Sequence, residues 1–316
     1  MLDDLLFSLN IVTPLFVLII LGFCLRRSGF VQGEFFQFGN KVVFYIGLPV
    51  TLFRSVAATD MAQLLDIGFV SYAVIATVVS FAVIWAAAHF FIEHKAVLGA
   101  FVQGSFRANI AFMGIPLMIS IAGAEGLARA ALVVTVVVPF YNICSVLVLS
   151  ACMESEQKFR LRDIIMTILK NPLVIGIAIG IAAAITGLRL PTVIAVPVDS
   201  IAEMASPLAL ICLGGGIAFQ GFDNKFKYAL IASITKVIVL PVAFTSVGFL
   251  LGYRGVDLAA IMVLGGTPSA ITGYVTAIQM GADGYTAGTI IVISTAMSAL
   301  TLTVFIYILR VMGMIG

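Results

Sequence analysis

Charged residues are scarce in this chain of 316 residues: Asp, Glu, Lys and Arg make up 10% of it, whereas apolar residues make up 62%. A soluble domain carries about 25% charged residues to cover its surface. The net charge of only +2, with no dense basic patch, argues against a nucleic-acid partner. The composition predicts an all-α protein that crosses a lipid bilayer many times.

Residues that commonly perform catalysis or bind metals are also rare. The chain has 2 His and 4 Cys, and neither type shows metal-ligand spacing. We find no nucleophile motif and no cluster of catalytic groups at matched depth, so we expect no enzyme, no metal and no cofactor. A receptor or sensor is another class to consider, but it usually needs a signalling domain or a long cytoplasmic loop, and the sequence shows neither.

Long polar segments are lacking too. The hydropathy pattern predicts ten membrane spans, near 9–25, 39–57, 67–91, 97–121, 126–152, 164–186, 197–219, 226–251, 256–280 and 286–310. The acidic start, MLDDLLFS, is unlike a cleavable signal peptide, so we interpret 9–25 as a retained helix. The longest strongly charged connection, MESEQKFRLRD (153–163), lies at the midpoint of the chain.

Lys and Arg in the loops predict the orientation. Alternate loops hold eight of these residues on one side: Arg26, Arg27, Lys95, Lys158, Arg160, Arg162, Lys225 and Lys227. The other side holds three: Arg189, Arg254 and Arg310. The richer side should be cytoplasmic, with the 153–163 linker there and both termini outside. We expect the inner membrane of a bacterium.

The two halves of the chain share Pro and Gly positions. At an offset of 158 residues, Pro14 falls on Pro172 and Pro49 on Pro207, and GAEG (123–126) falls on GADG (281–284). Each half, 1–152 and 164–316, holds five predicted spans. Because five is odd, the second half must begin on the opposite face, which gives an inverted repeat, common in secondary transporters.

Two apolar spans are interrupted by polar residues, Gly and Pro. ANIAFMGIPLM (108–118) lies in the fourth span, and at the same offset Arg107–Pro116 falls on GGTPSAITGY (265–274) in the ninth. A single such break is more often a packing kink. Two breaks at equivalent positions favour a substrate site, because freed amides attract anions and freed carbonyls attract cations.

The same segments resemble the auxin efflux carrier family. ANIAFMGIPLM resembles its fourth-helix motif, GNKVVFYIGLPVTLF (39–53) its second helix and GGTPSAITGYVTAIQMGAD (265–283) its ninth. The resemblance implies ten helices in two inverted repeats, with helices 1, 2, 6 and 7 as a scaffold and helices 3–5 and 8–10 as a transport domain. Helices 4 and 9 would cross at their breaks, the domain would move by an elevator mechanism, and the protein would be a homodimer through the scaffold.

One departure from the plant auxin carriers is the short central loop, here about eleven residues (153–163). The chain is more similar to compact prokaryotic members, some of which resemble malonate and malate permeases. This likeness makes auxin itself a doubtful natural substrate.

Polar residues at and near the breaks are the candidate substrate-binding set. Arg107 could neutralise a carboxylate, or it could cap a half-helix or pair with another charge; Lys236 is a second candidate anion partner. The full set is Arg107, Asn109, Gly114, Ile115, Pro116 and Asn142 in the first half, and Lys236, Gly266, Thr267, Pro268, Ser269 and Thr272 in the second. Asp199 and Glu203 could couple transport to H⁺ or Na⁺, or could face a scaffold partner.

The function that we predict is secondary active or facilitative transport of small organic anions, such as malonate, malate or auxin-like acids. Basic residues near the breaks favour an anion. A Na⁺-coupled symporter of the bile-acid type is the alternative within transport; an acidic residue in the ninth span would support it, and only Asp257 occurs there, at its edge.

Overall fold

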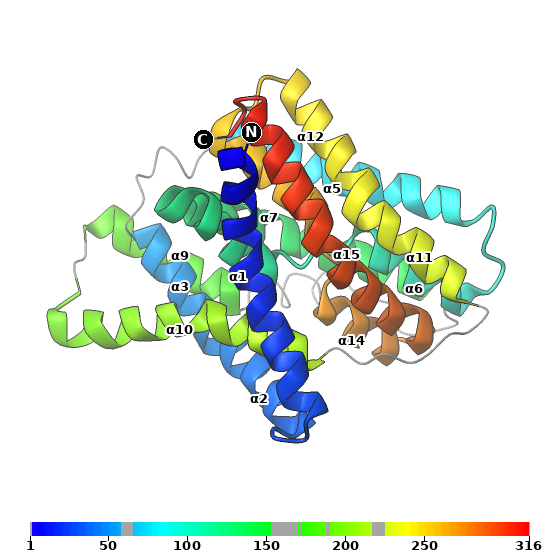
Figure 1. The fold of residues 1–316 in the computed structure, drawn as a ribbon, viewed down its shortest axis with the longest axis horizontal. Helices are drawn as coiled ribbons and strands as arrows, with labels where there is room; N and C mark the ends of the chain where they lie inside the picture. Colours follow the sequence, from blue (N-terminus) through cyan, green and yellow to red (C-terminus); the bar gives the residue numbers. More distant parts are fainter. Residues whose placement is uncertain are drawn as a thin grey trace.

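The computed structural model describes residues 2–57, 66–152, 170, 172–187, 190–216 and 225–315. Its helices, drawn in Figure 1, are α1 (Leu2–Arg27), α2 (Gly33–Val42), η1 (Val43–Gly47), α3 (Leu48–Ala57), α5 (Ile67–Ala88), α6 (Lys95–Phe106), η2 (Ile110–Gly114), α7 (Ile115–Cys152), α9 (Pro172–Thr186), α10 (Thr192–Gly216), α11 (Phe226–Ile234), η3 (Thr235–Val239), α12 (Leu240–Leu250), α13 (Gly255–Gly266), α14 (Ile271–Gln279) and α15 (Gly284–Val311). The predicted 153–163 linker lies outside the described residues.

The described part of the chain is all-helical, and several of its helices could span a bilayer. Six helical stretches are long and apolar enough to span a membrane: Asp4–Arg27, Ile67–Ala88, Ile110–Cys152, Thr192–Gly216, Phe226–Leu250 and Gly284–Val311. Pro172–Thr186 and Gly255–Gly266 are shorter apolar helices. Many large apolar side chains on the outer surface are exposed, such as Ile75, Ile179 and Leu300. Such a surface suits contact with lipid rather than water.

Three π turns, η1, η2 and η3, interrupt the α-helical pattern of the described residues, and each ends two residues before a proline. The prolines are Pro49, Pro116 and Pro241. Proline has no backbone N–H to donate to the carbonyl one turn earlier, and a π turn shifts the hydrogen-bond register around this gap. The chain therefore stays helical through the predicted second and eighth spans.

The fourth and ninth spans are broken, as the sequence predicted, and the first break lies at the start of the predicted segment 107–116. Helix α6 ends at Phe106, Arg107–Asn109 are non-helical, and η2 begins at Ile110. The break is shorter than the predicted segment, because Pro116 already lies inside the following helix. The second break, Thr267–Ala270, does contain Pro268.

Helix α7 carries the chain through a sharp kink. Ala122 and Gly123 depart from helical dihedrals, and Gly123 has φ 56°, which favours glycine. At Gly126 a Cβ would overlap the carbonyl of Met118, so the chain approaches itself closely across the kink. This kink stands where the sequence predicted a turn between the fourth and fifth spans.

Close helix pairs organise one side of the molecule. Helix α1 packs against α10, and α3 packs against α9 (Figure 1). A Cβ at Gly22 would overlap the carbonyl oxygen of Ile211, and a Cβ at Gly214 would overlap that of Ile19. The two helices therefore approach at backbone distance, which only small residues permit.

Ion pairs tie distant elements at the ends of helices. Arg310 Nε in α15 lies 3.3 Å from Asp4 Oδ1 in α1; the start of α1 and the end of α15 lie close together in Figure 1. Arg129 in α7 bridges two carboxylates, with Nη1 3.3 Å from Asp66 Oδ2 and Nε 2.6 Å from Asp257 Oδ1. The Arg129 bridge joins the start of α5 to the start of α13, so Asp257 is paired within the protein.

We expect Gly22→Ala to destabilise the protein, because its Cβ would force α1 away from α10. Overpacking of this kind costs about 1–3 kcal/mol, which thermal unfolding in detergent would detect. Gly68→Ala in α5 is the matched control, since its Cβ would lie 3.4 Å from Asp66 Oδ1, an ordinary contact. Equal melting temperatures for the two variants would contradict this account of the α1–α10 contact.

Candidate functional site: the crossing of two broken helices

The two breaks lie against each other and pair through their backbones. Asn109 N–H donates to the Pro268 carbonyl at 2.8 Å, and Ala270 N–H donates to the Arg107 carbonyl at 3.2 Å. These two bonds form an isolated antiparallel bridge between Ala108 and Ser269. Non-helical backbone inside a membrane protein needs partners from the protein itself. Each break therefore supplies the hydrogen bonds that the other lost.

A cavity of about 450 Å³ opens at this crossing. Its volume suits a small organic ligand. Residues of both breaks and of the two half-helices that follow them line it: Arg107, Ala108, Asn109, Ile110, Ala111, Phe112, Ala270, Thr272 and Thr276. Phe44 and Tyr45 of η1, Val138, Tyr141 and Asn142 of α7, and Lys170, Pro172 and Leu173 complete the lining.

Arg107 is a buried cation at the wall of this cavity, with an exposed fraction of 6%. Its Nη1 donates to Ser145 Oγ at 3.0 Å, and its Nη2 donates to Asn142 Oδ1 at 2.9 Å and Thr272 Oγ1 at 3.3 Å. All three acceptors are neutral, and no carboxylate among the described residues forms an ion pair with Arg107. Its positive charge is oriented but not neutralised.

Asn109 adds a free donor to the same wall. The residue is 3% exposed, and its Nδ2 has no hydrogen-bond partner among the described residues. A buried amide donor without a partner costs about 1–3 kcal/mol. Because Asn109 lines the cavity, a ligand there can supply the acceptor.

Two half-helices begin at the cavity. The backbone at Ile110 starts η2 and the backbone at Ile271 starts α14, next to the lining residues Ala270 and Thr272. The first amides of a helix have no partner within it and carry the positive end of its dipole. Both helix starts add to the positive potential that Arg107 creates.

The predicted site residues divide into those that line the cavity and those that support it. Arg107, Asn109, Asn142 and Thr272 line it. The others lie outside the lining set: Thr267, Pro268 and Ser269 in the second break itself, and Gly114, Ile115, Pro116, Gly266 and Lys236 in the helices around the crossing. Their places suit them to shaping the backbone rather than touching a ligand.

Lys236 is fully buried and bonded to backbone instead of facing the cavity. Its Nζ donates to the carbonyls of Leu264, at 3.5 Å, and of Gly265. Both carbonyls belong to the last turn of α13, directly before the second break. Lys236 thus contacts the back of the crossing.

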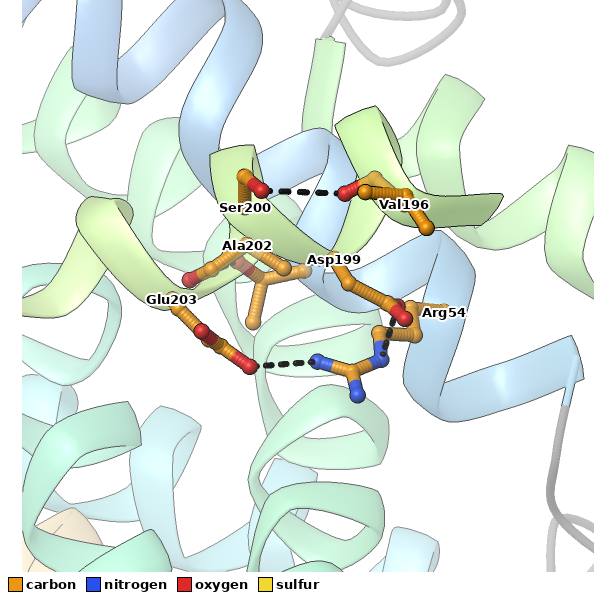
Figure 2. A network of polar contacts seen from close by, with 7 residues as sticks. Arg54, Val196, Asp199, Ser200, Ala202 and Glu203 are labelled. Carbon is orange, nitrogen blue, oxygen red and sulfur yellow. Dashed lines mark hydrogen bonds and ion pairs between the residues drawn. The ribbon is translucent and has the colours of Figure 1, made fainter. Parts of the chain in front are cut away.

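Asp199 and Glu203 lie outside the cavity lining and pair with Arg54. Figure 2 shows the Arg54 side chain of α3 reaching both carboxylates of α10, with Arg54 Nε 2.8 Å from Asp199 Oδ1 and Arg54 Nη1 4.0 Å from Glu203 Oε1. All three side chains are at least 44% exposed. The two carboxylates therefore have a partner within the protein, on α3.

Sequence reasoning missed several lining residues. Phe44 of η1 stacks on Phe112 of η2, with ring centroids 6.5 Å apart and planes 9° apart. Lys170, which is exposed, adds a second positive charge to the lining. The shared signal for the two aromatic residues is a proline five or four positions later, at Pro49 and Pro116, which places each in a π turn.

Apolar spans, two crossed breaks and a cavity whose wall holds a buried cation without a counter-charge define an integral membrane transporter. A family model described as "Membrane transport protein" matches residues 7–306. The chain belongs to this family, the auxin efflux carrier family that its motifs resemble, which confirms that prediction.

Its curated relatives match over nearly the whole length. A "Putative malonate transporter" of Rhizobium meliloti (strain 1021) is 27% identical over 312 residues, covering 95% of each chain. An uncharacterized transporter of Methanocaldococcus jannaschii is 23% identical over 309 residues, covering 95% of this chain and 98% of the relative. Another, of Methanothermobacter thermautotrophicus, is 24% identical over 306 residues, with 96% and 98% covered.

We expect Pro116→Ala to reshape the cavity. Alanine restores the missing N–H, so η2 can become α-helical and rotate its lining residues by roughly 100°. In a background without native cysteines, Ala111→Cys should then react more slowly with a small water-soluble thiol reagent. Pro14→Ala in α1 is the control and should leave the rate unchanged; equal rates in all three proteins would show that Pro116 does not maintain the π turn.

Proposed function

We propose that this protein is a secondary transporter of small organic anions, carboxylates such as malonate or malate, bound in the cavity where the two broken helices cross. The observation that carries the proposal is Arg107, a buried guanidinium at the cavity wall with only neutral side-chain acceptors around it. Burying a charge without a counter-charge is costly, so such residues in membranes mark substrate paths.

The donors around Arg107 suit a carboxylate. A guanidinium binds a carboxylate through two parallel hydrogen bonds, and Asn109 Nδ2 offers a further donor without a second buried charge. Lys170 gives the cavity another cation, which suits a dianion with two separated carboxylates. The name of the Rhizobium relative, a putative malonate transporter, agrees with a substrate of this size and charge.

The inverted repeat and the elevator mechanism belong to this proposal. In an inverted repeat, α1 corresponds to α9 and α3 to α10, so the contact of α1 with α10 corresponds to that of α3 with α9; both contacts exist. These helices would form the scaffold. The crossed helices would move against it, and the Phe44–Phe112 contact joins the two parts. The stacked rings of Phe44 and Phe112 are flat and uncharged, which suits a surface along which the two parts slide past each other.

Assembly and orientation complete the proposal. Asp199, Glu203 and Arg54 form an exposed charged cluster on a membrane-spanning helix pair, and charge facing lipid is costly. A second copy of the scaffold would cover it, as a homodimer. The excess of Lys and Arg in alternate loops supports both termini outside and an inner-membrane location.

The main test is uptake of labelled malonate, malate and larger monocarboxylates into proteoliposomes. We expect Arg107→Gln to weaken binding about ten- to a hundredfold, since a hydrogen bond to a charged group contributes about 1.5–3 kcal/mol. Arg27→Gln makes the same chemical change at an exposed residue away from the cavity and should transport normally. Wild-type affinity in Arg107→Gln would remove this residue from the site and the anion from the proposal.

The charge of the substrate can be tested at Asn109. Asn109→Ala should reduce affinity about threefold to tenfold by removing a donor. Asn109→Asp, nearly the same shape, should reduce affinity further, because its carboxylate would repel an anion and pair with Arg107. Affinity by isothermal calorimetry should follow the order Asn, Ala, Asp; an Asp variant that binds as well as Ala would argue against an anionic substrate.

A further inference from the structure

The second break leaves two backbone carbonyls without their helical partners. In a continuous helix, the carbonyl of Leu264 accepts from the N–H of residue 268, and the carbonyl of Gly265 accepts from the N–H of residue 269. Residue 268 is Pro268, which has no N–H. Ser269 N–H donates instead to Ser294 Oγ at 3.1 Å. The break thus frees the same two carbonyls that Lys236 contacts.

Lys236 meets both of these carbonyls from another helix. It lies in η3, and its Nζ donates to Leu264 and Gly265. The π turn, which ends two residues before Pro241, includes Lys236, and the whole side chain is buried with an exposed fraction of 0%. Among the described residues no carboxylate forms an ion pair with it.

The electrostatics at this place favour a cation. The last turn of α13 presents free carbonyls and the negative end of a helix dipole, equivalent to roughly half an electron charge. Carbonyl oxygens freed by an unwound membrane helix are the ligands that transporters use to bind Na⁺. Here an ammonium group, held by the chain, occupies the carbonyls that a free ion would need.

We propose that Lys236 is a tethered cation, whose ammonium group takes the place of a bound monovalent metal ion at the second break and holds that break open. Lys236 is therefore a positioning residue: it acts on the substrate cavity through the backbone of Leu264–Ala270. Stability and transport need no Na⁺ or K⁺ at this position. This inference rests on the second break and holds for any substrate that the cavity carries.

The two buried cations at the crossing then have different tasks. Arg107 donates to side chains at the cavity wall, and Lys236 donates to backbone behind it. At the offset of 158 residues, the position in the first half that is equivalent to Lys236 is Val78. A tethered cation is therefore proposed for the second break alone. The first break has its Asn109 and Arg107 backbone groups paired across the crossing instead.

The test compares four substitutions that separate charge, hydrogen bonding and volume. Lys236→Arg keeps the charge, Lys236→Gln keeps donors without charge, Lys236→Met keeps the volume alone, and Lys236→Ala leaves space. We expect Gln and Met to lower the melting temperature by roughly 10 °C and to abolish uptake, with Arg closest to wild type. Wild-type stability in Gln or Met would overturn the proposal, because a neutral side chain would then suffice.

The decisive readout is dependence on inorganic cations. Melting temperature and uptake of wild type should be equal in NaCl, KCl and choline chloride. Lys236→Ala should be stabilised in a saturable way by Na⁺ or K⁺ but not by choline, which is too large for the vacated space. If Lys236→Ala folds but shows no such response, Lys236 has a packing role and the proposal is wrong. If Lys236→Ala does not fold, the proposal is wrong when Lys236→Met folds and Lys236→Arg does not.

Failure of this proposal is distinct from failure of the anion-transport proposal. Gly265→Ala would be a poor control, because its Cβ would lie 2.7 Å from Pro241 Cα. Lys227→Met on α11 removes a cation from the same span and should change neither stability nor cation dependence. A cation response in Lys236→Ala with no carboxylate uptake by wild type would support the tethered cation and reject the substrate.

Discussion

The backbone of an unwound helix cannot leave its polar groups unpaired inside a membrane, and the rest of the site depends on how this chain meets that constraint. Asn109 and Ala270 donate across the crossing to Pro268 and Arg107. Lys236 donates to the carbonyls of Leu264 and Gly265, which receive no hydrogen bond from residues 268 and 269. Once these groups are paired, two half-helix starts can remain at the edge of a cavity without collapsing into continuous helices. The cavity can thus exist because the backbone polar groups at both breaks have hydrogen-bond partners. Its positive potential follows from the helix starts and Arg107.

Three prolines shape the site from a distance, Pro49, Pro116 and Pro241, whereas Pro268 lies in the second break and Pro172 lines the cavity. Each π turn of the described residues ends two positions before a proline, and each presents a residue at or behind the crossing: Phe44, Phe112 and Lys236. A missing N–H costs the α-helix one hydrogen bond, and a π turn redistributes that loss while widening the helix locally. Other prolines, such as Pro14 and Pro139, lie in α-helices without such a turn. The neighbours packed around a proline therefore decide which response the helix adopts.

Charged residues in the apolar spans separate into three environments. Arg107 has neutral side-chain acceptors and a cavity, Lys236 has backbone carbonyls and no cavity, and Arg54 has two exposed carboxylates on α10. Of these three, only Arg107 leaves a positive charge available to a ligand. The sequence shows these three residues as similar basic positions, because hydropathy and spacing carry no information about which helices meet.

Composition and apolar run lengths alone determined that the protein is helical and membrane-spanning, since hydrocarbon tolerates few other structures. Local chemistry also predicted that two spans break, because polar residues, Gly and Pro interrupt the apolar pattern at equivalent positions in the two halves, 107–116 and 265–274. Tertiary structure decided the rest. It confined the first break to Arg107–Asn109 within the predicted segment 107–116, paired Asp199 and Glu203 with Arg54, and brought Phe44 and Lys170 to a cavity formed by segments over a hundred residues apart. These outcomes depend on which surfaces pack together, and burial, pairing and packing are properties of the assembled helices rather than of any single segment.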